Sequence, residues 1–266
     1  MIDPGIVSPS NPRIKAAVRL RDRRERDHTG LTLVDGAREL RRALDAEAVV
    51  EEAFVHEPLV RSVDARLVLQ RLQAAEANLV AVSDTAFGKL AFGDRSDGII
   101  AIVRTPETDL KRLEMPPDPL VAVLEGVEKP GNVGAVLRSV DGAGADALVV
   151  ADPRTDVFNP NAIRASLGTI FTVPIGAGTT ADVRAWLQGL TIRVVAARPD
   201  AAAAPWDIDL TGPVAIVLGS EAEGLGERWL DDEVTGVRIP MRGSADSLNV
   251  SVAAAILLYE ARRQRG

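Results

Sequence analysis

The sequence predicts an α/β protein with two domains. Short runs rich in β-branched residues alternate along the chain with longer stretches of helical periodicity, and this alternation is typical of α/β folds. Residues 105–119 interrupt it with four prolines, several acidic residues and no apolar periodicity, as an exposed connection does. We therefore predict a first domain at residues 1–105, a linker at 106–118 and a second domain at 119–266.

The first domain begins with a helix predicted over residues 11–27. Asn11 suits the N-cap position, and Pro12 suits the first turn, where its missing N–H has no helical partner. Ser83 or Asp84 is expected to cap a later helix. The remaining elements follow from periodicity: helices at 36–44 and 58–75, and strands at 31–34, 49–55, 79–82 and 98–103.

The second domain continues the alternation around an apolar strand at residues 214–218, which is too short and too β-branched for a helix. A final helix is predicted to open at residues 244–249. Its apolar residues recur at helical spacing and are expected to form one face: Leu248, Val252, Ile256 and Tyr259. The other elements are helices after Gly134 and near 160–167 and 180–189, and strands at 120–124, 147–150, 171–173, 192–196 and 237–240.

Three loops lie between residues 213 and 256, and each follows or precedes an apolar run. Open α/β sheets bind ligands at the carboxyl ends of their parallel strands. The three loops are therefore predicted to form one ligand pocket.

Composition narrows the class of protein. The chain has 266 residues, of which 46% are hydrophobic and 26% charged, as in soluble globular proteins. No apolar run approaches the ~20 residues that span a bilayer, and the first residues lack the features of a signal peptide. There is no cysteine and there are only two histidines, which excludes disulfide frameworks and most zinc sites. We expect a cytoplasmic protein without a metal and without a membrane partner.

Charge is distributed unevenly. The net charge is −7, yet residues 11–42 contain ten basic and only five acidic side chains. A basic stripe on an acidic protein can bind a polyanion, because the local potential matters more than the sum. A solvated helix face is the alternative interpretation of the same charges.

A glycine-containing loop follows the strand at 120–124. Its sequence is Lys129-Pro130-Gly131-Asn132-Val133-Gly134, and Arg138 lies one helical turn beyond it. A dinucleotide-dependent enzyme would have the same order of strand, loop and helix, with Asp152 as its ribose ligand. The glycine spacing lacks the G-x-G-x-x-G pattern, which argues against that class.

Residues 128–146, 217–225 and 239–265, in this order, resemble the three motifs of the SpoU/TrmH class of SPOUT RNA ribose methyltransferases. Residues 159–175, between the first two motifs, are also similar to the family's pattern. In the first domain, residues 33–40 and 87–101 resemble the family's substrate-binding domain, which is a small ribosomal-protein-like α/β domain. The resemblance therefore extends over both predicted domains.

The resemblance implies a methyltransferase domain with a parallel sheet flanked by helices, a C-terminal trefoil knot, a homodimer and S-adenosylmethionine as cofactor. Glycine at position 219 would let the backbone approach the cofactor closely, because it has no Cβ. Carried over by motif, the cofactor-binding residues are Ala197, Leu218, Gly219, Ser220, Ile239, Pro240, Met241 and Leu248.

The resemblance also implies the catalytic residues, which are Asn132, Arg138, Glu221, Ser247 and Asn249. Arg138 occupies the position of the family's proposed base. An arginine side chain ordinarily keeps its proton up to about pH 12. We therefore expect Arg138 to hold the adjacent phosphate and to stabilise charge that develops on the ribose oxygen.

Contacts with RNA are expected from arginines in both domains. Arg164 would contact a second phosphate, and the basic stripe would contribute Arg21, Arg23 and Arg24. The first domain has few aromatic residues, so recognition by shape and phosphate is favoured over stacking on bases.

The predicted function is therefore transfer of a methyl group from S-adenosylmethionine to a ribose 2′-hydroxyl in RNA. Ribosomal RNA is favoured over tRNA, because the first domain resembles that of the family's rRNA enzymes. A tRNA methyltransferase of the same class is one alternative. A non-catalytic RNA-binding or assembly factor on the same fold is another, and the presence of Arg138, Glu221 and Asn249 speaks against it.

Overall fold

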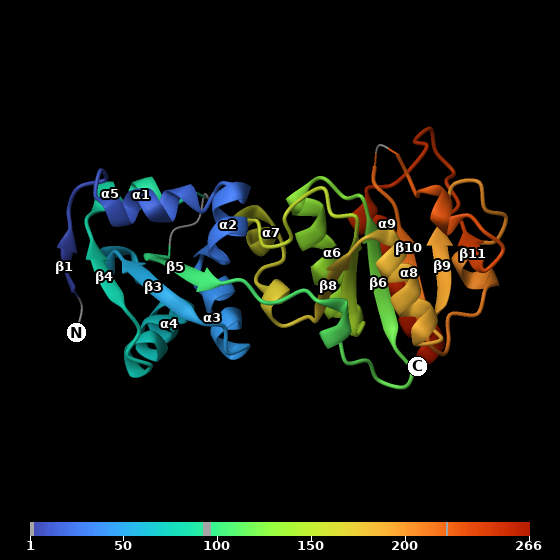
Figure 1. Cartoon of the computed structure of the whole chain (residues 1–266), viewed down its shortest axis with the longest axis horizontal. Coiled ribbons are helices and arrows are strands. Elements are labelled where there is room, and N and C mark those ends of the chain that lie inside the picture. The colour runs from blue at the N-terminus through green and yellow to red at the C-terminus, as the bar shows by residue number, and fades with distance from the viewer. Residues whose placement is uncertain (1–2, 93–96, 222) are drawn as a thin grey trace. The chain divides into compact units, whose positions relative to one another are not determined.

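The computed structural model describes residues 3–92, 97–221 and 223–266, and Figure 1 shows their fold. The chain forms two compact units. The first unit combines Met1–Pro106 with Phe158–Thr172, and the second combines Glu107–Val157 with Val173–Gly266. The chain therefore passes from one unit to the other three times.

The first unit is built on a five-stranded mixed sheet in the order β1-β4-β3-β5-β2. β5 pairs antiparallel with β2 and β3, whereas β4 pairs parallel with β1 and β3. The strands are β1 (Asp3–Ile6), β2 (Leu31–Asp35), β3 (Val50–Val55), β4 (Leu79–Val82) and β5 (Ile99–Arg104).

Helices cover both faces of this mixed sheet (Figure 1). α1 (Pro12–Arg19) and α5 (Asp84–Leu90) pack on one face, and α3 (Ala37–Asp45) and α4 (Val63–Ala74) cover the other. The unit also contains α2 (Arg23–Thr29), α7 (Pro160–Ala165) and the 3₁₀ turns η1 (Glu57–Leu59) and η3 (Thr169–Phe171). α7 packs beside β2, so the segment 158–172 is part of the first unit's fold.

The second unit is built on a six-stranded sheet in the order β11-β9-β10-β6-β7-β8. Every pairing in it is parallel. The central strands β6, β7 and β10 are buried along their length, as strands covered on both faces are, and their sequences are nearly continuous apolar runs for the same reason. The strands are β6 (Leu120–Glu125), β7 (Ala147–Ala151), β8 (Ile175–Gly178), β9 (Arg193–Ala197), β10 (Val214–Leu218) and β11 (Val234–Val237).

Different helices pack on the two faces of the parallel sheet. α8 (Thr180–Gly189) packs on one face together with the buried Trp229. α6 (Pro130–Ala143) and α9 (Val250–Arg265) pack against each other, and α9 also packs on β6 and β10. The short 3₁₀ turns are η2 (Leu110–Arg112), η4 (Pro205–Asp207) and η5 (Glu227–Trp229). No helix in the described part of the chain is long and apolar enough to cross a membrane.

The α/β class is confirmed, and so is the cap of the first helix. The Asn11 side chain accepts a hydrogen bond from the Arg13 N–H at 2.9 Å. The prediction of one helix over residues 11–27 is wrong, because α1 ends at Arg19 and α2 begins at Arg23. The Asp22 side chain accepts from the Arg24 N–H at 3.1 Å and so starts a second helix.

Two strand predictions are also wrong. Residues 171–173 are not a strand, because Gly168 takes a left-handed conformation that leads into η3, and β8 begins only at Ile175. Residues 237–240 contain only the last residue of β11. That strand ends where its partner β9 ends, since Val237 lies opposite Ala197.

α9 follows its Asn249 cap, but its apolar face is not the one that the spacing indicated. Val252, Ile256 and Tyr259 are 46%, 37% and 52% exposed. The buried face is instead Val250, Ala254, Leu257, Leu258 and Ala261. Two alanines in this face reduce its hydrophobic signal, because small side chains score weakly although they allow close packing.

The segment predicted as a linker contains structured residues. Leu110 in η2 is buried, and the Ala177 N–H of β8 donates to the Thr108 carbonyl at 2.8 Å. This part of residues 106–118 therefore adds to the second unit. The C-terminal trefoil knot stays a prediction from the resemblance.

Gly168 provides a test of how segment 158–172 is held in the first unit. A Cβ at this position would lie 2.8 Å from the Glu39 Cα, and its φ is +86°. Gly30 has a similar φ of +65°, but a Cβ there would meet nothing within 4 Å. A left-handed backbone costs a residue with a Cβ about 1–2 kcal/mol, so Gly30→Ala should lower the free energy of unfolding by about that amount.

Gly168→Ala should lower it by about 1–3 kcal/mol more than Gly30→Ala, because the new methyl group overpacks against backbone. Urea unfolding of both variants under the same conditions measures the difference. Equal losses in the two variants would contradict the packing of Gly168 on α3.

Candidate active site

Two neighbouring strands bring the polar loops of the second unit together. β6 and β10 pair in register, with Leu124 opposite Leu218. The loops that follow them therefore start side by side at the carboxyl edge of the sheet, where parallel sheets bind ligands. The first of these loops leads into α6 and contains Lys129, and the second contains Glu221.

Glu221 is the acceptor on which the polar side chains of the site converge. Its Oε1 accepts from the Asn249 Nδ2 at 2.6 Å and from the Asn132 Nδ2 at 3.1 Å. Its Oε2 accepts from the Lys129 Nζ at 2.5 Å. Asn249 also caps α9 by accepting from the Ser251 N–H at 2.9 Å. Three of the predicted catalytic residues therefore form one hydrogen-bonded group.

Lys129 and Glu221 each stabilise the charged form of the other. The hydrogen bond from Lys129 lowers the pKa of Glu221, and the amides of Asn132 and Asn249 lower it further. The same contact with Glu221 raises the pKa of Lys129. Both side chains are therefore charged at neutral pH. Lys129 cannot accept a proton there, and Glu221 is a weak base whose oxygens already have donors.

The group borders a cavity of about 200 Å³. Its remaining walls are Val127, Glu128, Ser220 and Val250. Of the two amides, only that of Asn132 borders the cavity, and an amide held there by an ionised carboxylate can orient a hydroxyl group for reaction.

Arg154 links the two loops of the site. Its guanidinium donates to the Glu128 Oε1 at 2.8 Å and also to the Glu223 Oε2. Glu128 lies beside Lys129 in the loop after β6, and Glu223 lies in the loop after β10. The two carboxylates raise the pKa of Arg154, so the link is charged throughout the physiological range.

The predicted cofactor residues lie at or beyond the carboxyl ends of three neighbouring strands, β10, β9 and β11. Leu218 and Ala197 end β10 and β9. Between β11 and α9 the chain has no regular secondary structure, and this stretch contains Ile239, Pro240, Met241 and Leu248. Their role in binding S-adenosylmethionine stays a prediction from the resemblance.

Gly219 has a local reason for being glycine. A Cβ there would lie 2.2 Å from the Gly224 carbonyl carbon and 2.5 Å from the Leu225 nitrogen. The loop is closed by two backbone hydrogen bonds of 3.0 and 3.1 Å between Ser220 and Gly224. The close approach expected at Gly219 is therefore made by the loop's own backbone, and this tight loop presents Ser220 and Glu221.

The other two predicted catalytic residues are not part of the Glu221 group. Arg138 lies on the exposed side of α6, and Ser247 is exposed in the stretch before α9. Neither has a hydrogen bond or ion pair with another residue that the structure describes. Arg138 is thus a cation available for a ligand.

The predicted RNA-binding arginines belong to the first unit and differ in their contacts. Arg21 donates to the carbonyls of Lys89, Leu90 and Ala91, at 3.1, 2.7 and 3.1 Å. Arg23 forms an ion pair with Asp27 at 3.4 Å. The Arg24 side chain is exposed and has no hydrogen bond or ion pair within the described residues.

Arg164 also has a partner in the first unit. Its guanidinium lies 3.6 Å from the Asp35 Oδ2 and stacks over the Phe92 ring, 5.7 Å from the ring centroid. Arg21 lies over the same ring at 5.4 Å. Arg21 and Arg164 therefore both stabilise the fold of this unit, whatever else they bind.

Sequence reasoning missed Lys129 and Arg154 as site residues. Lys129 stands in the quoted glycine-containing loop, and its place directly before Pro130 could have marked it. Arg154 has no such signal, since the two carboxylates that it joins are 26 and 69 residues away in the chain.

A parallel α/β unit with polar loops at its strand ends, joined to a small mixed-sheet unit, is the arrangement that the resemblance to SPOUT RNA methyltransferases implied. Residues 119–259 match the SpoU rRNA Methylase family, and residues 11–101 match the MRM3-like substrate binding domain. The chain belongs to the SpoU rRNA methylase family.

Individual relatives agree with this assignment. The 23S rRNA (guanosine-2′-O-)-methyltransferase RlmB of a Burkholderia species is 36% identical over 82% of this chain and 90% of its own. A crystal structure of an RNA 2′-O ribose methyltransferase is 44% identical, with a TM-score of 0.86 and 98% of both chains covered. The SpoU methyltransferase AviRb of Streptomyces viridochromogenes in complex with AdoMet is 30% identical, with a TM-score of 0.86 over 96% of this chain and 98% of that one.

Arg154 provides a test of how the site is held together. Arg154→Ala should leave overall stability almost unchanged, because the side chain is exposed. It should lower kcat/KM for methyl transfer about two- to tenfold, the range expected when one or two exposed ion pairs are lost. Arg154→Lys should recover part of the loss, since lysine keeps the charge but cannot donate to two carboxylates from one planar group.

The matched control is Arg112→Ala, which removes an exposed ion pair with Glu107 elsewhere in the second unit. Steady-state kinetics of the three variants measure the effect. If Arg154→Ala behaves like the control, Arg154 does not position the loops.

Proposed function

We propose that the chain transfers the methyl group of S-adenosylmethionine to a ribose 2′-hydroxyl of 23S ribosomal RNA. The observation that supports this best is the group of Lys129, Asn132 and Asn249 around Glu221, at the edge of the sheet where the family's motifs meet. The relatives named above support the choice of 23S RNA and of the cofactor.

Bound S-adenosylmethionine supplies a methyl group made electrophilic by its sulfonium and is released as S-adenosylhomocysteine. The proton that the ribose 2′-hydroxyl loses would pass to solvent water. The chain's own residues hold and orient the ribose. The Asn132 amide, which Glu221 fixes at the cavity wall, would bind the 2′-hydroxyl, and Asn249 would hold Asn132 and Glu221 in position. Arg138 would bind the adjacent phosphate and stabilise charge that develops on the oxygen. Glu221 acts through the amides, because its lowered pKa makes it a poor base.

The first unit would hold the RNA, as its match to a substrate-binding domain suggests. Lys15 and Arg24 of the basic stripe are exposed, and the side chain of each lacks a hydrogen bond or ion pair among the described residues. These two side chains are better suited to phosphate contacts than Arg21 or Arg164, which already bind groups of their own unit.

The active form would be a homodimer, as the resemblance implies. Val252, Ile256 and Tyr259 support this, because they form an exposed apolar row along one side of α9, and such a row is typical of an interface. We also propose that residues 105–119 separate an RNA-binding domain from a methyltransferase domain. The protein would act in the cytoplasm, where ribosomal RNA is modified.

Arg138 is the residue that tests the proposed chemistry. Removal of one preorganised stabiliser of a transition state costs about 100- to 1,000-fold in turnover, and we expect a loss of that order for Arg138→Ala. Arg138→Lys should lose less, because it keeps the charge without the planar fork. Single-turnover transfer of labelled methyl to transcribed 23S RNA, at saturating protein, measures the chemical step.

The control is Arg228→Ala, which removes another exposed arginine of the second unit that has no side-chain partner among the described residues. Calorimetry should find normal cofactor affinity in all three variants. A rate near that of the unaltered enzyme for Arg138→Ala would remove Arg138 from the mechanism.

The basic stripe tests how RNA is bound. Replacing Lys15 and Arg24 together by alanine should weaken RNA binding and reduce the slope of log K against log salt by about 0.7–0.9 for each charge that contacted a phosphate. Cofactor affinity should not change. Arg66→Ala, an exposed arginine on α4 outside the stripe, is the control. An unchanged slope in the double variant would show that the stripe is only a solvated surface.

A further inference from the structure

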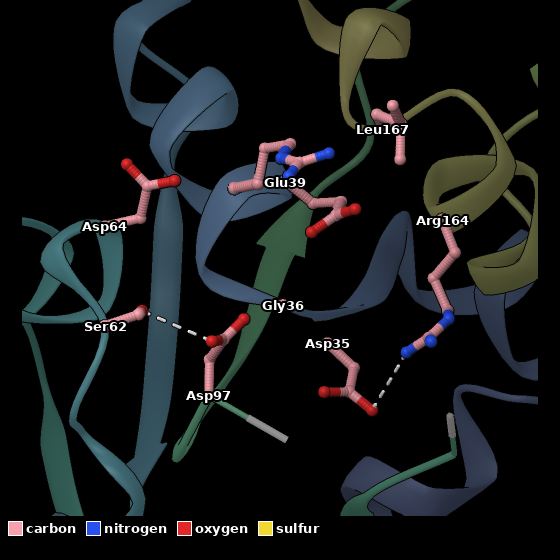
Figure 2. Close-up of a pocket in the computed structure, with 9 residues that line it drawn as sticks. Asp35, Gly36, Glu39, Ser62, Asp64, Asp97, Arg164 and Leu167 are labelled. Atoms are coloured by element: carbon pink, nitrogen blue, oxygen red, sulfur yellow. Dashed lines mark hydrogen bonds and ion pairs between the residues drawn. The ribbon is translucent and has the colours of Figure 1, made fainter. Parts of the chain in front are cut away.

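A second polar cavity lies within the first unit, apart from the Glu221 group. Its volume is about 420 Å³, within the ~300–1,000 Å³ typical of small-ligand sites. Figure 2 shows Asp35, Glu39 and Asp97 around Gly36, with Arg164 and Leu167 on another side. All of these residues belong to the first unit.

Some of the acids that line this cavity already have partners. The Asp97 Oδ2 accepts from the Ala37 N–H at 3.1 Å, and its Oδ1 accepts from the Ser62 hydroxyl at 3.3 Å. Asp64 forms an ion pair with Arg41 at 3.3 Å. Asp97 therefore joins the N-termini of α3 and α4, and these acids shape the wall.

Asp35 is different, because one of its oxygens has no donor. Its Oδ2 accepts from the Phe92 N–H at 3.0 Å and faces Arg164. Its Oδ1 is buried without a hydrogen-bond partner among the described residues, and the residue is only 1% exposed. A buried carboxylate oxygen without a donor is rare and costly in folded proteins.

Glu39 offers a second carboxylate next to Asp35. Its Oε2 lies directly over Gly36, where a Cβ would come within 2.2 Å of it. Glycine at this position therefore leaves room for the carboxylate on the cavity wall. Burial raises the pKa of both Asp35 and Glu39, so a ligand that donates hydrogen bonds to them would relieve the cost of their burial.

Arg38 gives the cavity a cationic side. It is exposed and has no hydrogen bond or ion pair within the part of the chain that the structure describes. A ligand in the cavity would therefore meet carboxylate oxygens that accept N–H donors, and it would meet a cation at Arg38. A metal ion does not fit, because no three acidic or histidine side chains among the described residues are arranged to hold one.

We propose that this cavity binds an unpaired nucleobase of the RNA through the base's own N–H groups, with Arg38 on its phosphate. The inference rests on the proposed function, which supplies RNA as the substrate. Guanine fits best, because its N1–H and N2–H groups are adjacent donors, whereas uracil has only one N–H on its pairing edge. Proteins commonly read single-stranded RNA by hydrogen bonds to this edge.

The experiment is calorimetric titration of the full chain with GMP, IMP and UMP, with S-adenosylmethionine present at saturation to occupy the cofactor site. GMP should bind best, and IMP, which lacks the N2 amine, should bind about tenfold less tightly or worse, as when one base-reading hydrogen bond is lost. Equal binding of the three nucleotides, or no binding of GMP, would overturn the proposal.

Variants locate the binding. Glu39→Gln and Arg38→Ala should each weaken GMP about tenfold, the effect of losing a contact that reads a base or its phosphate, while Glu76→Gln, an exposed acid at the end of α4, should have no effect. Asp35→Asn should act like Glu39→Gln if it folds, and the first two variants decide the matter if it does not. GMP affinity that is unchanged in Glu39→Gln and Arg38→Ala would overturn the proposal.

Measurements of methyl transfer distinguish a failure of the proposed nucleobase cavity from a failure of the proposed enzyme activity. In Glu39→Gln the KM for 23S RNA should rise while kcat at saturating RNA stays the same. An unaltered enzyme that fails to methylate 23S RNA contradicts the proposed function, whereas the nucleotide titrations test the cavity without any methyl transfer. Normal methylation with an unchanged KM in Glu39→Gln would count against the cavity alone.

Discussion

The carboxylate of Glu221 is the interaction on which the arrangement of the candidate active site depends. The parallel sheet brings the loops after β6 and β10 to the same edge, but it does not orient their side chains. That orientation comes from one carboxylate that accepts hydrogen bonds from the Lys129 ammonium group and from the amides of Asn132 and Asn249. Because the carboxylate is ionised, these hydrogen bonds are stronger than neutral ones and fix the amides before any ligand binds.

The first unit uses its arginines for two purposes. Arg21 and Arg164 lie over the Phe92 ring, and Arg164 also balances the buried charge of Asp35. Arg26 is buried as well and donates to the Leu20 carbonyl, whereas Lys15, Arg24 and Arg38 are exposed. A count of the arginines in the sequence therefore overstates how many of them can bind RNA. Arg164 pairs with the buried Asp35, and Arg21 donates to the carbonyls at the end of α5.

Sequence patterns predicted the structure correctly where neighbouring residues alone determine the local conformation. The Asn11 cap and the strand at 214–218 follow from local chemistry, and the structure has both. The resemblance placed Asn132, Glu221 and Asn249 in one site, and they are in contact, although their catalytic roles stay predictions. The buried face of α9 could not be predicted by spacing, because the alanines that pack closely are less hydrophobic than the exposed Val252 and Ile256. Arg154 was missed because its two partners are distant in the chain.

The membership of segment 158–172 in the first unit has a consequence for the synthesis of the chain. α7 packs beside β2, the Thr32 hydroxyl donates to the Phe158 carbonyl at 2.7 Å, and Asp35 pairs with Arg164. A ribosome produces residues 1–106 first, but the unit that they belong to is complete only when Thr172 has emerged. By then β6 and β7 of the other unit already exist. The N-terminal unit therefore gains its last contacts only after part of the other unit has been synthesised, and recombination at a single point would separate segment 158–172 from the rest of this unit.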